Sequence, residues 1–196
     1  MIQQPTHQAS NATAILVPED GPAFEVTNDL GGSRVILVCE HASNRVPISL
    51  GSLGLTDEQL RSHIAWDPGA SDLSQDLSSD LDATLIEARF SRLVYDLNRP
   101  PEAISAMPSK TEVCFVPGND NIDATDRVER TSRIYVPFHA ELSRIIAIKR
   151  AMGTAPIIVT VHSFTPVFNG VEREVEIGLL HGNNGRLANA MLENSA

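Results

Sequence analysis

Residues 35–41, VILVCEH, decide the prediction of the fold, because five apolar residues end abruptly in a carboxylate and an imidazole. An apolar run of this length is typical of a strand that lies inside a sheet and is covered on both faces. A second run, PIIVTVH, ends in the same way at His162. The sequence therefore predicts two buried strands that each deliver a histidine at their last step.

Further patterns along the chain alternate between strands and helices. We expect additional strands at AFEVTND, TLIEARF, RLVYDLN and EVEIGLLHG, and an irregular polar stretch over residues 100–133. We expect helices at LTDEQLRSHIA, ASDLSQDLSSDLDATL, VPFHAELSRIIAIKRAMG and NGRLANAMLEN. In the second of these, Leu73, Leu77 and Leu81 predict the apolar stripe that faces the core. This order predicts an α/β domain with a mainly parallel or mixed sheet flanked by helices.

Length and charge limit the class of protein. The chain has 196 residues, and we expect a polar, flexible segment over residues 1–22 and a single domain over residues 23–196. The formal net charge of -10 argues against nucleic acid or an anionic membrane as the main partner. With no bilayer-length apolar run and no signal-peptide pattern, we expect a cytoplasmic protein whose oligomeric state stays open.

The two strand-end histidines predict a metal site. If their strands are parallel neighbours, His41 and His162 meet at one edge of the sheet, where α/β sheets collect ligands. Two histidines and one carboxylate are a common ligand set for zinc, and the same set suits non-heme iron. Glu40, Asp67 and Asp96 compete for the third position. We favour Asp67, which lies in the turn of HIAWDPGA before a helix.

The remaining cysteines and histidines have simpler interpretations. Cys39 and Cys114 lie far apart in the sequence and are expected to be buried free thiols. The alternative is a nucleophilic Cys39 that uses a nearby histidine. Four histidines lack a strand-end position and are expected in loops or on helix surfaces: His7, His63, His139 and His181.

A second group of polar residues lies in SRLVYDLNRPP. Arg92 and Arg99 flank an apolar stretch, and Asn98 precedes the second arginine. An arginine fork can hold a carboxylate through two charge-assisted hydrogen bonds, although many arginines only pair with an acid on the surface. Because the chain is acidic overall, a small anionic substrate would need a local cation of this kind.

Five motifs in order resemble the N-formylglutamate amidohydrolase family: CEHASNRVP, HIAWDPGASDL, SRLVYDLNRPP, YVPFHAEL and VTVHSFTPVFNG. The resemblance implies a fold and chemistry like those of the zinc carboxypeptidases. It implies a hydrolase of histidine-degradation type that cleaves N-formyl-L-glutamate, or a similar N-acyl acidic amino acid, to formate and glutamate. The implied cofactor is one zinc ion, with iron or cobalt as alternatives.

The resemblance also assigns roles to single residues. His41 and His162 match the strand-end ligands. Carboxypeptidases have His-x-x-Glu at the first ligand pair; this chain has Asn44 in place of the glutamate, so Asp67 is expected as the third ligand. Asn98 and Arg99 match an Asp-x-Asn-Arg segment that holds a substrate carboxylate. Two further assignments complete the expected site, with Arg92 facing the oxyanion and Ser163 contacting the substrate.

The general base is harder to assign. The resemblance implies a Glu-Ile-Arg segment near the C-terminus whose glutamate is the base, and the domain is expected to lack that C-terminal part. Glu174 and Glu176 are the nearby substitutes, and we choose Glu176. Three rival interpretations stay open: an inactive relative that holds metal and binds acidic amino acids, an amidase that uses Cys39, and a non-heme iron enzyme.

Overall fold

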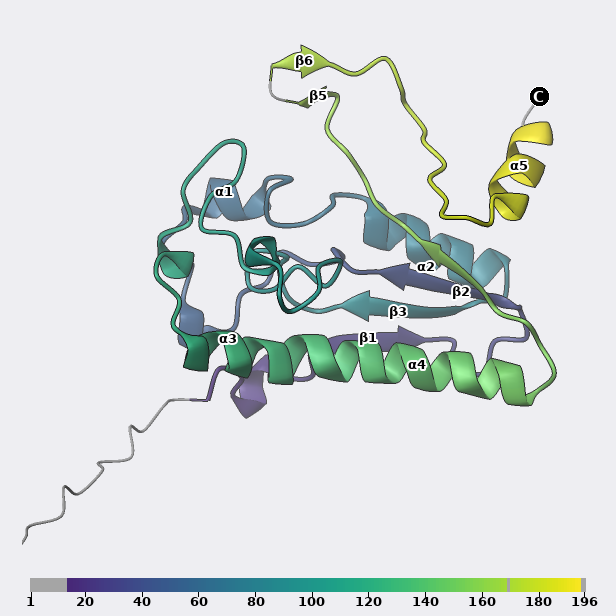
Figure 1. Ribbon diagram of the computed structural model, residues 1–196, viewed down its shortest axis with the longest axis horizontal. Helices are drawn as coiled ribbons and strands as arrows, with labels where there is room; N and C mark the ends of the chain where they lie inside the picture. Colours follow the sequence, from purple (N-terminus) through teal and green to yellow (C-terminus); the bar gives the residue numbers. More distant parts are fainter. Residues whose placement is uncertain (1–13, 169, 195–196) are drawn as a thin grey trace, which may run out of the picture. The chain divides into compact units, whose positions relative to one another are not determined.

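The computed structural model describes residues 14–168 and 170–194 and divides the chain into two compact units, residues 1–163 and 164–196. The first unit is an α/β fold with a mixed four-stranded sheet (Figure 1). Its strands are β1 (Phe24–Thr27), β2 (Val35–Cys39), β3 (Thr84–Ala88) and β4 (Ile157–Thr160). Its α-helices are α1 (Asp57–Arg61), α2 (Ala70–Asp80), α3 (Ala124–Arg130) and α4 (Val136–Ala151). Its shorter helical turns are η1 (Pro18–Asp20), η2 (Ile48–Leu50), η3 (Ile104–Ala106), η4 (Pro117–Asn119) and the π turn η5 (Thr131–Tyr135).

The strand order in this sheet is β1-β3-β2-β4. Strand β2 pairs in parallel with both β3 and β4, while β1 runs antiparallel to β3 at one edge. Val38 of β2 lies opposite Thr160 of β4, so the two strands end at the same edge of the sheet. The prediction that the two histidine-ending strands are parallel neighbours is confirmed.

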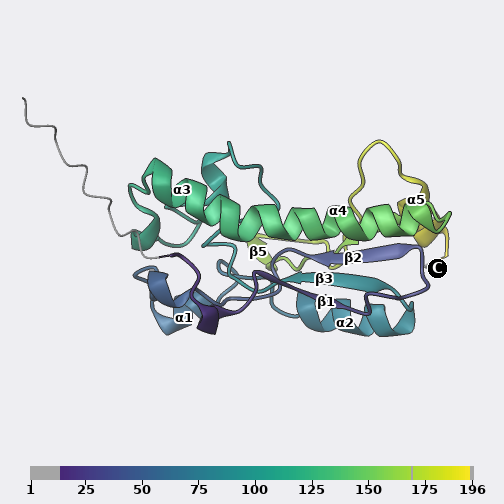
Figure 2. The ribbon, with the colours of Figure 1, turned by 90° about the horizontal axis from the view of Figure 1, so that it is seen from below.

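The side chains of β2 alternate between two apolar clusters. Ile36 and Val38 belong to a cluster that also contains Phe138 of α4. Leu37 belongs to a second cluster, which contains Ala70 of α2. Figure 2 shows α4 on one face of the sheet and α2 on the other. The apolar run VILVC is therefore covered on both faces, as its composition predicts.

Helix α2 buries only part of the leucine stripe that the sequence predicts, because Leu77 packs against the second cluster while the other two leucines are largely exposed. Leu73 and Leu81 are 50% and 47% exposed, whereas Ala70, Ser74 and Ser78 are buried. The small residues face the sheet, and the buried Ser74 hydroxyl donates to the carbonyl oxygen of Ala70 at 2.7 Å. Because local carbonyl groups satisfy the serine hydroxyls, a serine face can be buried, and the prediction from leucine spacing was wrong for Leu73 and Leu81.

The apolar residues of RLVYDLN are buried but do not form the predicted strand. The Ser91 hydroxyl accepts from the amide of Leu93 at 3.1 Å and donates to the carbonyl oxygen of Ala65 at 2.7 Å. The amide of Val94 donates to the carbonyl oxygen of Ser91 at 2.9 Å. Serine side chains of this kind favour turns over extended strands, so the backbone of 92–98 bends where a strand was expected.

The helix expected from residue 136 is α4, and an unpredicted helical segment precedes it inside the stretch 100–133, which was expected to be irregular. Asp123 caps α3 by accepting from the amide of Asp126 at 2.8 Å. Helix α3 continues through η5 into α4, with helical backbone angles at each junction. The π turn ends two residues before Pro137, which has no N–H to donate into an α-helical ladder.

The second unit contains a two-stranded antiparallel pair, β5 (Val167–Phe168) and β6 (Val171–Glu172), and the predicted closing helix, α5 (Arg186–Glu193). The strand expected at EVEIGLLHG is absent from the described residues, where Val175 and Ile177 are exposed and no strand pairs with this stretch. Without a partner strand, its backbone groups have no ladder to join.

The N-terminal segment that was expected to be flexible lies only partly within the described residues. Most of the segment expected to be flexible, residues 1–13, lies outside the described residues, and so does His7. The described remainder of that segment packs onto the first unit, with Ile15 and Asp20 buried.

Within the ranges that the structure covers, no helix has the length and apolar character needed to cross a bilayer.

A buried arginine ties helix α3 to the segment that follows β3. Arg130 is 2% exposed, and its Nη1 donates to Oδ1 of Asn119 at 2.7 Å and to the carbonyl oxygen of Val94 at 3.3 Å. The amide nitrogen of the Asn119 side chain donates to the carbonyl oxygens of Leu93 and Pro108, at 2.7 and 2.9 Å. Asn119 therefore satisfies a buried guanidinium donor and two carbonyl groups at once.

We predict that Asn119→Ala lowers the free energy of unfolding by about 2 kcal/mol or more, since it leaves a buried guanidinium donor and two carbonyl groups without their partner. Urea unfolding followed by circular dichroism measures this. The control is Asn183→Ala at an exposed asparagine, which should change stability by no more than about 0.5 kcal/mol. Equal losses in both variants would contradict the bridging role.

Candidate metal centre

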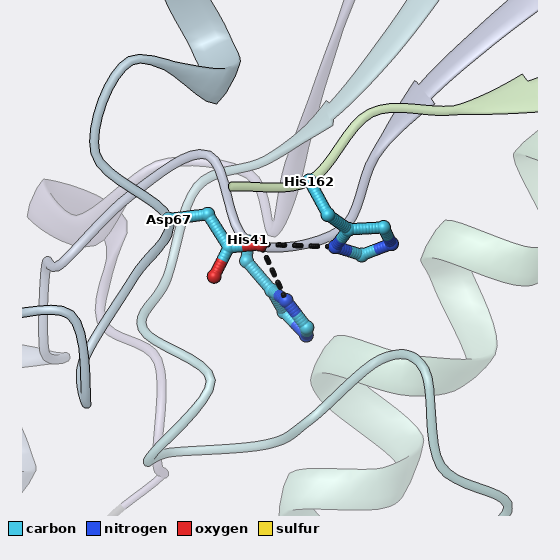
Figure 3. Close-up of side chains that lie close together, drawn as sticks. All are labelled: His41, Asp67 and His162. Atoms are coloured by element: carbon cyan, nitrogen blue, oxygen red, sulfur yellow. Dashed lines mark hydrogen bonds and ion pairs between the residues drawn. The ribbon is translucent and has the colours of Figure 1, made fainter. Parts of the chain in front are cut away.

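The structure brings His41, Asp67 and His162 together at the edge where β2 and β4 end (Figure 3). Oδ2 of Asp67 lies 3.3 Å from Nδ1 of His41 and 2.9 Å from Nδ1 of His162. The two imidazole rings have centroids 5.0 Å apart. One atom from each residue lies within 4.8 Å of the others, so the three side chains could hold a single metal ion.

The backbone around Asp67 explains how this side chain reaches both histidines. The amide of Asp67 donates to the carbonyl oxygen of His41 at 3.0 Å, which fixes the turn against the end of β2. Gly69, at the start of α2, has a φ of 81°, a left-handed conformation that favours glycine. The sequence Asp-Pro-Gly thus turns the chain sharply into α2 while its first residue stays at the sheet edge. The expected turn before a helix is confirmed.

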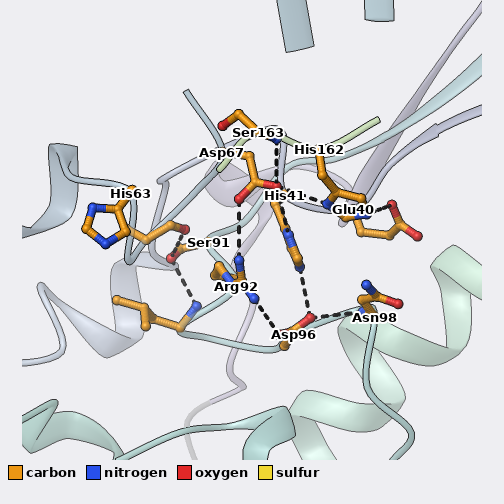
Figure 4. Close-up of polar contacts among 12 residues, drawn as sticks. Glu40, His41, His63, Asp67, Ser91, Arg92, Asp96, Asn98, His162 and Ser163 are labelled. Atoms are coloured by element: carbon orange, nitrogen blue, oxygen red, sulfur yellow. Dashed lines mark hydrogen bonds and ion pairs between the residues drawn. The ribbon is translucent and has the colours of Figure 1, made fainter. Parts of the chain in front are cut away.

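Two more carboxylates lie behind the histidine rings (Figure 4). Nε2 of His41 is 2.9 Å from Oδ1 of Asp96, and Nε2 of His162 is 3.5 Å from Oε2 of Glu40. Each ring thus points Nδ1 toward Asp67 and Nε2 toward a second carboxylate. Ligand histidines commonly have a carboxylate on the ring nitrogen that is not bound to metal, because it fixes the tautomer and the ring orientation.

Arg92 closes a ring of polar contacts around His41. Its Nη1 donates to Oδ1 of Asp67 at 3.3 Å, and its Nη2 donates to Oδ2 of Asp96 at 3.0 Å. His41 contacts the other oxygen of each of these carboxylates. The imidazole and the guanidinium therefore hold the same two aspartates from opposite sides, which restricts the rotation of both carboxylates.

The protonation of the centre follows from these contacts. Burial favours the neutral acid, yet hydrogen bonds to His162 and His41 hold the pKa of Asp67 well below its usual range. Burial likewise opposes ionisation of Asp96, but its contact with His41 lowers its pKa. Burial would lower the pKa of His41, and the two aspartates more than reverse that effect, so its pKa is raised.

The donor set fits a divalent cation. If each ring carries its proton on Nε2, facing Asp96 or Glu40, the lone pairs of both Nδ1 atoms point at the same carboxylate oxygen. Three electron-rich atoms in that arrangement repel one another unless a proton or a cation lies among them. Ligands about 2.0–2.1 Å from a tetrahedral ion lie about 3.3 Å from each other, close to the separations from Asp67.

A buried atom near the centre also lacks a partner. Among the described residues, Oε2 of Glu40 is buried and makes no hydrogen bond. Burial raises the pKa of Glu40. This oxygen lies 3.5 Å from Nε2 of His162. A proton on Nε2 therefore points toward the Glu40 carboxylate, whose Oε2 has no other donor among the described residues. The assignment of both Nε2 protons to outer carboxylates is consistent with this environment.

The other residues predicted for the site lie at different distances from this centre. The backbone amide of Ser163 donates to Oδ2 of Asp67 at 3.4 Å, and that of Asn98 donates to Oδ1 of Asp96 at 3.0 Å. Nε of Arg99 is 4.0 Å from Oδ2 of Asp96, and its side chain is 53% exposed. Glu176 belongs to the second unit, 164–196, and its role as base stays a prediction.

Sequence reasoning missed the outer partners of the two histidines. It treated Glu40 and Asp96 only as competitors of Asp67 for the metal. The structure gives all three carboxylates a place, one between the rings and one behind each ring. The available hint was that each carboxylate lies within or beside a motif that already contained a candidate ligand or arginine.

Cys39 is poorly suited to act as a nucleophile. It is completely buried in the cluster between the sheet and α2, and burial raises the pKa of its thiol to about 12. The thiolate, which is the reactive form, is therefore rare at neutral pH. Cys114, in contrast, is partly exposed. The environment of Cys39 argues against a cysteine-dependent reaction.

We predict that iodoacetamide at pH 7.5 modifies Cys114 at least about tenfold faster than Cys39, because the Cys39 thiol is buried and protonated. Peptide mass spectrometry over a time course measures both rates in the same sample. Unfolding the protein in urea should remove the difference, which serves as the internal control. Rapid labelling of Cys39 in the folded protein would contradict this reading and restore the thiol as a candidate.

Comparisons with known proteins agree with the motifs. The family model described as N-formylglutamate amidohydrolase matches residues 33–196. A crystal structure of the gene product Atu2144 from Agrobacterium tumefaciens is similar, with a TM-score of 0.89 and 52% sequence identity over 91% of this chain and 71% of that chain. No curated protein gives a significant match. The family match includes His41, Asp67 and His162.

Proposed function

The chain belongs to the N-formylglutamate amidohydrolase family, and from this premise we propose that it cleaves N-formyl-L-glutamate, or a similar N-acyl acidic amino acid, with the help of one divalent metal ion. The observation that carries the proposal is the convergence of two Nδ1 atoms on one carboxylate oxygen, between His41, His162 and Asp67. Zinc is the proposed ion, because two histidines and one carboxylate are a common set in hydrolytic zinc sites.

Each residue of the centre has a part in this proposal. His41, His162 and Asp67 would hold the ion. When bound, zinc supplies Lewis acidity and lowers the pKa of a coordinated water toward about 7. Asp96 and Glu40 orient the imidazole rings, because they lie beside the Nε2 atoms of His41 and His162. A glutamate accepts the proton of the attacking water and returns it to the leaving amine, and Glu176 remains the proposed base.

Arg92 and Arg99 have separate proposed roles, Arg92 at the oxyanion and Arg99 at the substrate carboxylate. A guanidinium has five N–H groups, and the two aspartates engage one on each terminal nitrogen of Arg92. Its remaining N–H groups can face the oxyanion that forms at the formyl carbon. Arg99 is half exposed, and within the described ranges its one ion-pair contact is the long one to Asp96. Its guanidinium is therefore the group proposed to bind the amino-acid carboxylate, and Asn98 and Ser163 are the two further substrate contacts that we propose.

We predict that the purified protein holds about one equivalent of zinc. His162→Ala should lose most of it, because only two of the three proposed ligands remain. Elemental analysis by mass spectrometry measures zinc, iron and cobalt together. His181→Ala, at an exposed histidine of the second unit, is the matched control and should keep the metal. Full metal retention in His162→Ala would remove this residue from the ligand set.

We predict that Arg99→Ala raises KM for N-formyl-L-glutamate about 10- to 100-fold with a smaller change in kcat, because paired charge-assisted hydrogen bonds to the substrate carboxylate are lost. Steady-state kinetics of formate release measures both constants. The control is Arg144→Ala, an exposed arginine of α4 that pairs with Glu141. An unchanged KM in Arg99→Ala would rule out the carboxylate grip.

A further inference from the structure

The motif YVPFHAEL, residues 135–142, has no part in the proposed reaction, yet it places a histidine against the segment 96–99. His139 lies in α4, and its Nε2 is 3.1 Å from the carbonyl oxygen of Leu97. A carbonyl oxygen only accepts, so Nε2 carries the proton in this bond. His139 was expected in a loop or on a helix surface. In the structure it is half-buried, and its contact with the Leu97 carbonyl was not predicted.

Aromatic rings hold the imidazole of His139 in place. Its centroid is 4.1 Å from that of Tyr135, one turn earlier in the helix, and 5.5 Å from that of Phe138. The ring of Tyr135 in turn lies 5.2 Å from the buried ring of Tyr95, the residue before Asp96. The helix thus contacts the segment on both sides of Asp96, through an aromatic pair before it and a hydrogen bond after it.

The contacted segment carries two groups that matter at the centre. Asp96 bonds to His41 and Arg92, which keep its carboxylate in place. Arg99 has no comparable anchor in the described structure, because its side chain is 53% exposed and lies 4.0 Å from Asp96. The position of its guanidinium therefore depends on the backbone of residues 97–99, and that backbone is bonded to α4 through His139.

We infer that His139 is a positioning residue, which holds the backbone of Leu97 so that Arg99 meets the carboxylate of the substrate. This inference rests on the proposed function for the role of Arg99. It concerns substrate binding more than metal binding, since Asp96 keeps its contacts to His41 and Arg92 without His139. A residue that only packed the helix would affect stability and leave KM unchanged.

The test compares His139→Leu with His139→Gln. Leucine fills a similar volume without a donor, whereas the glutamine amide can still donate to the Leu97 carbonyl. We expect His139→Leu to raise KM for N-formyl-L-glutamate about 3- to 10-fold, the range for one lost hydrogen bond, with kcat changed less than about twofold. His139→Gln should recover most of the lost affinity. In an Arg99→Ala background, His139→Leu should have no further effect on KM.

A second readout does not depend on catalysis. The amides of Asn98 and Arg99 donate to Asp96, at 3.0 and 2.9 Å, and loosening of this turn should speed their exchange with deuterium. We expect faster exchange over residues 97–99 in His139→Leu, near-native exchange in His139→Gln, and no change over β2 in either variant. Zinc content should stay at the wild-type level in both.

The outcomes separate this inference from the proposed function. Wild-type protein that does not hydrolyse N-formyl-L-glutamate would contradict the proposed function, and the exchange data would then decide the role of His139 alone. Native KM and native exchange in His139→Leu would overturn the inference, as would a glutamine variant no better than the leucine variant. An additive effect with Arg99→Ala would overturn the claim that His139 acts through Arg99.

Discussion

The centre depends on one constraint, which is that a single carboxylate oxygen of Asp67 faces the Nδ1 atoms of both His41 and His162. His41 and Asp67 are buried, while His162 is partly exposed. Each Nδ1 atom can carry a proton and donate it to this oxygen, whereas one divalent cation can take all three atoms as ligands when the rings carry their protons on Nε2. The outer carboxylates favour the second arrangement, because a carboxylate beside Nε2 stabilises the tautomer in which Nδ1 is free to bind a metal.

The rest of the fold serves to hold that arrangement. Parallel pairing of β2 with β4 brings the two histidines to the same edge, and the buried apolar run of β2 fixes the register of that edge. A glycine in the left-handed region lets Asp67 turn back against the strand end. Arg92 and Asp96 then close a ring of contacts around His41. The buried pair of Arg130 and Asn119 ties the segment before Asp96 to helix α3.

Local patterns in the sequence predict those parts of the structure that local interactions determine. The helix expected at LTDEQLRSHIA is one such case, because Thr56 and Gln59 form a capping box at its start, although the helix itself has only five residues. The apolar run of β2 predicts its own burial, and the repeated strand-end histidine predicts that the two imidazole rings meet at one edge of the sheet. In each case the determining contacts lie within a few residues, or follow from the general geometry of a parallel sheet.

Other features depend on contacts between distant segments and could not be read in the same way. The burial of serines in α2, with Leu73 exposed, depends on how closely the helix approaches the sheet. The turn at Ser91 competes with a strand through a bond to Ala65, 26 residues away. The places of Asp96 and Glu40 behind the rings require the relative positions of strand ends and turns. These are properties of the assembled unit, and spacing along the chain does not contain them.

X-ray absorption spectroscopy of the zinc-loaded protein tests the central claim most directly, because it measures the atoms around the ion itself. We expect two imidazole nitrogens and one carboxylate oxygen at about 2.0–2.1 Å, with the outer-shell scattering typical of histidine rings and no sulfur. A first shell of oxygen atoms alone, or one that contains sulfur at about 2.3 Å, would contradict the assignment of His41, His162 and Asp67.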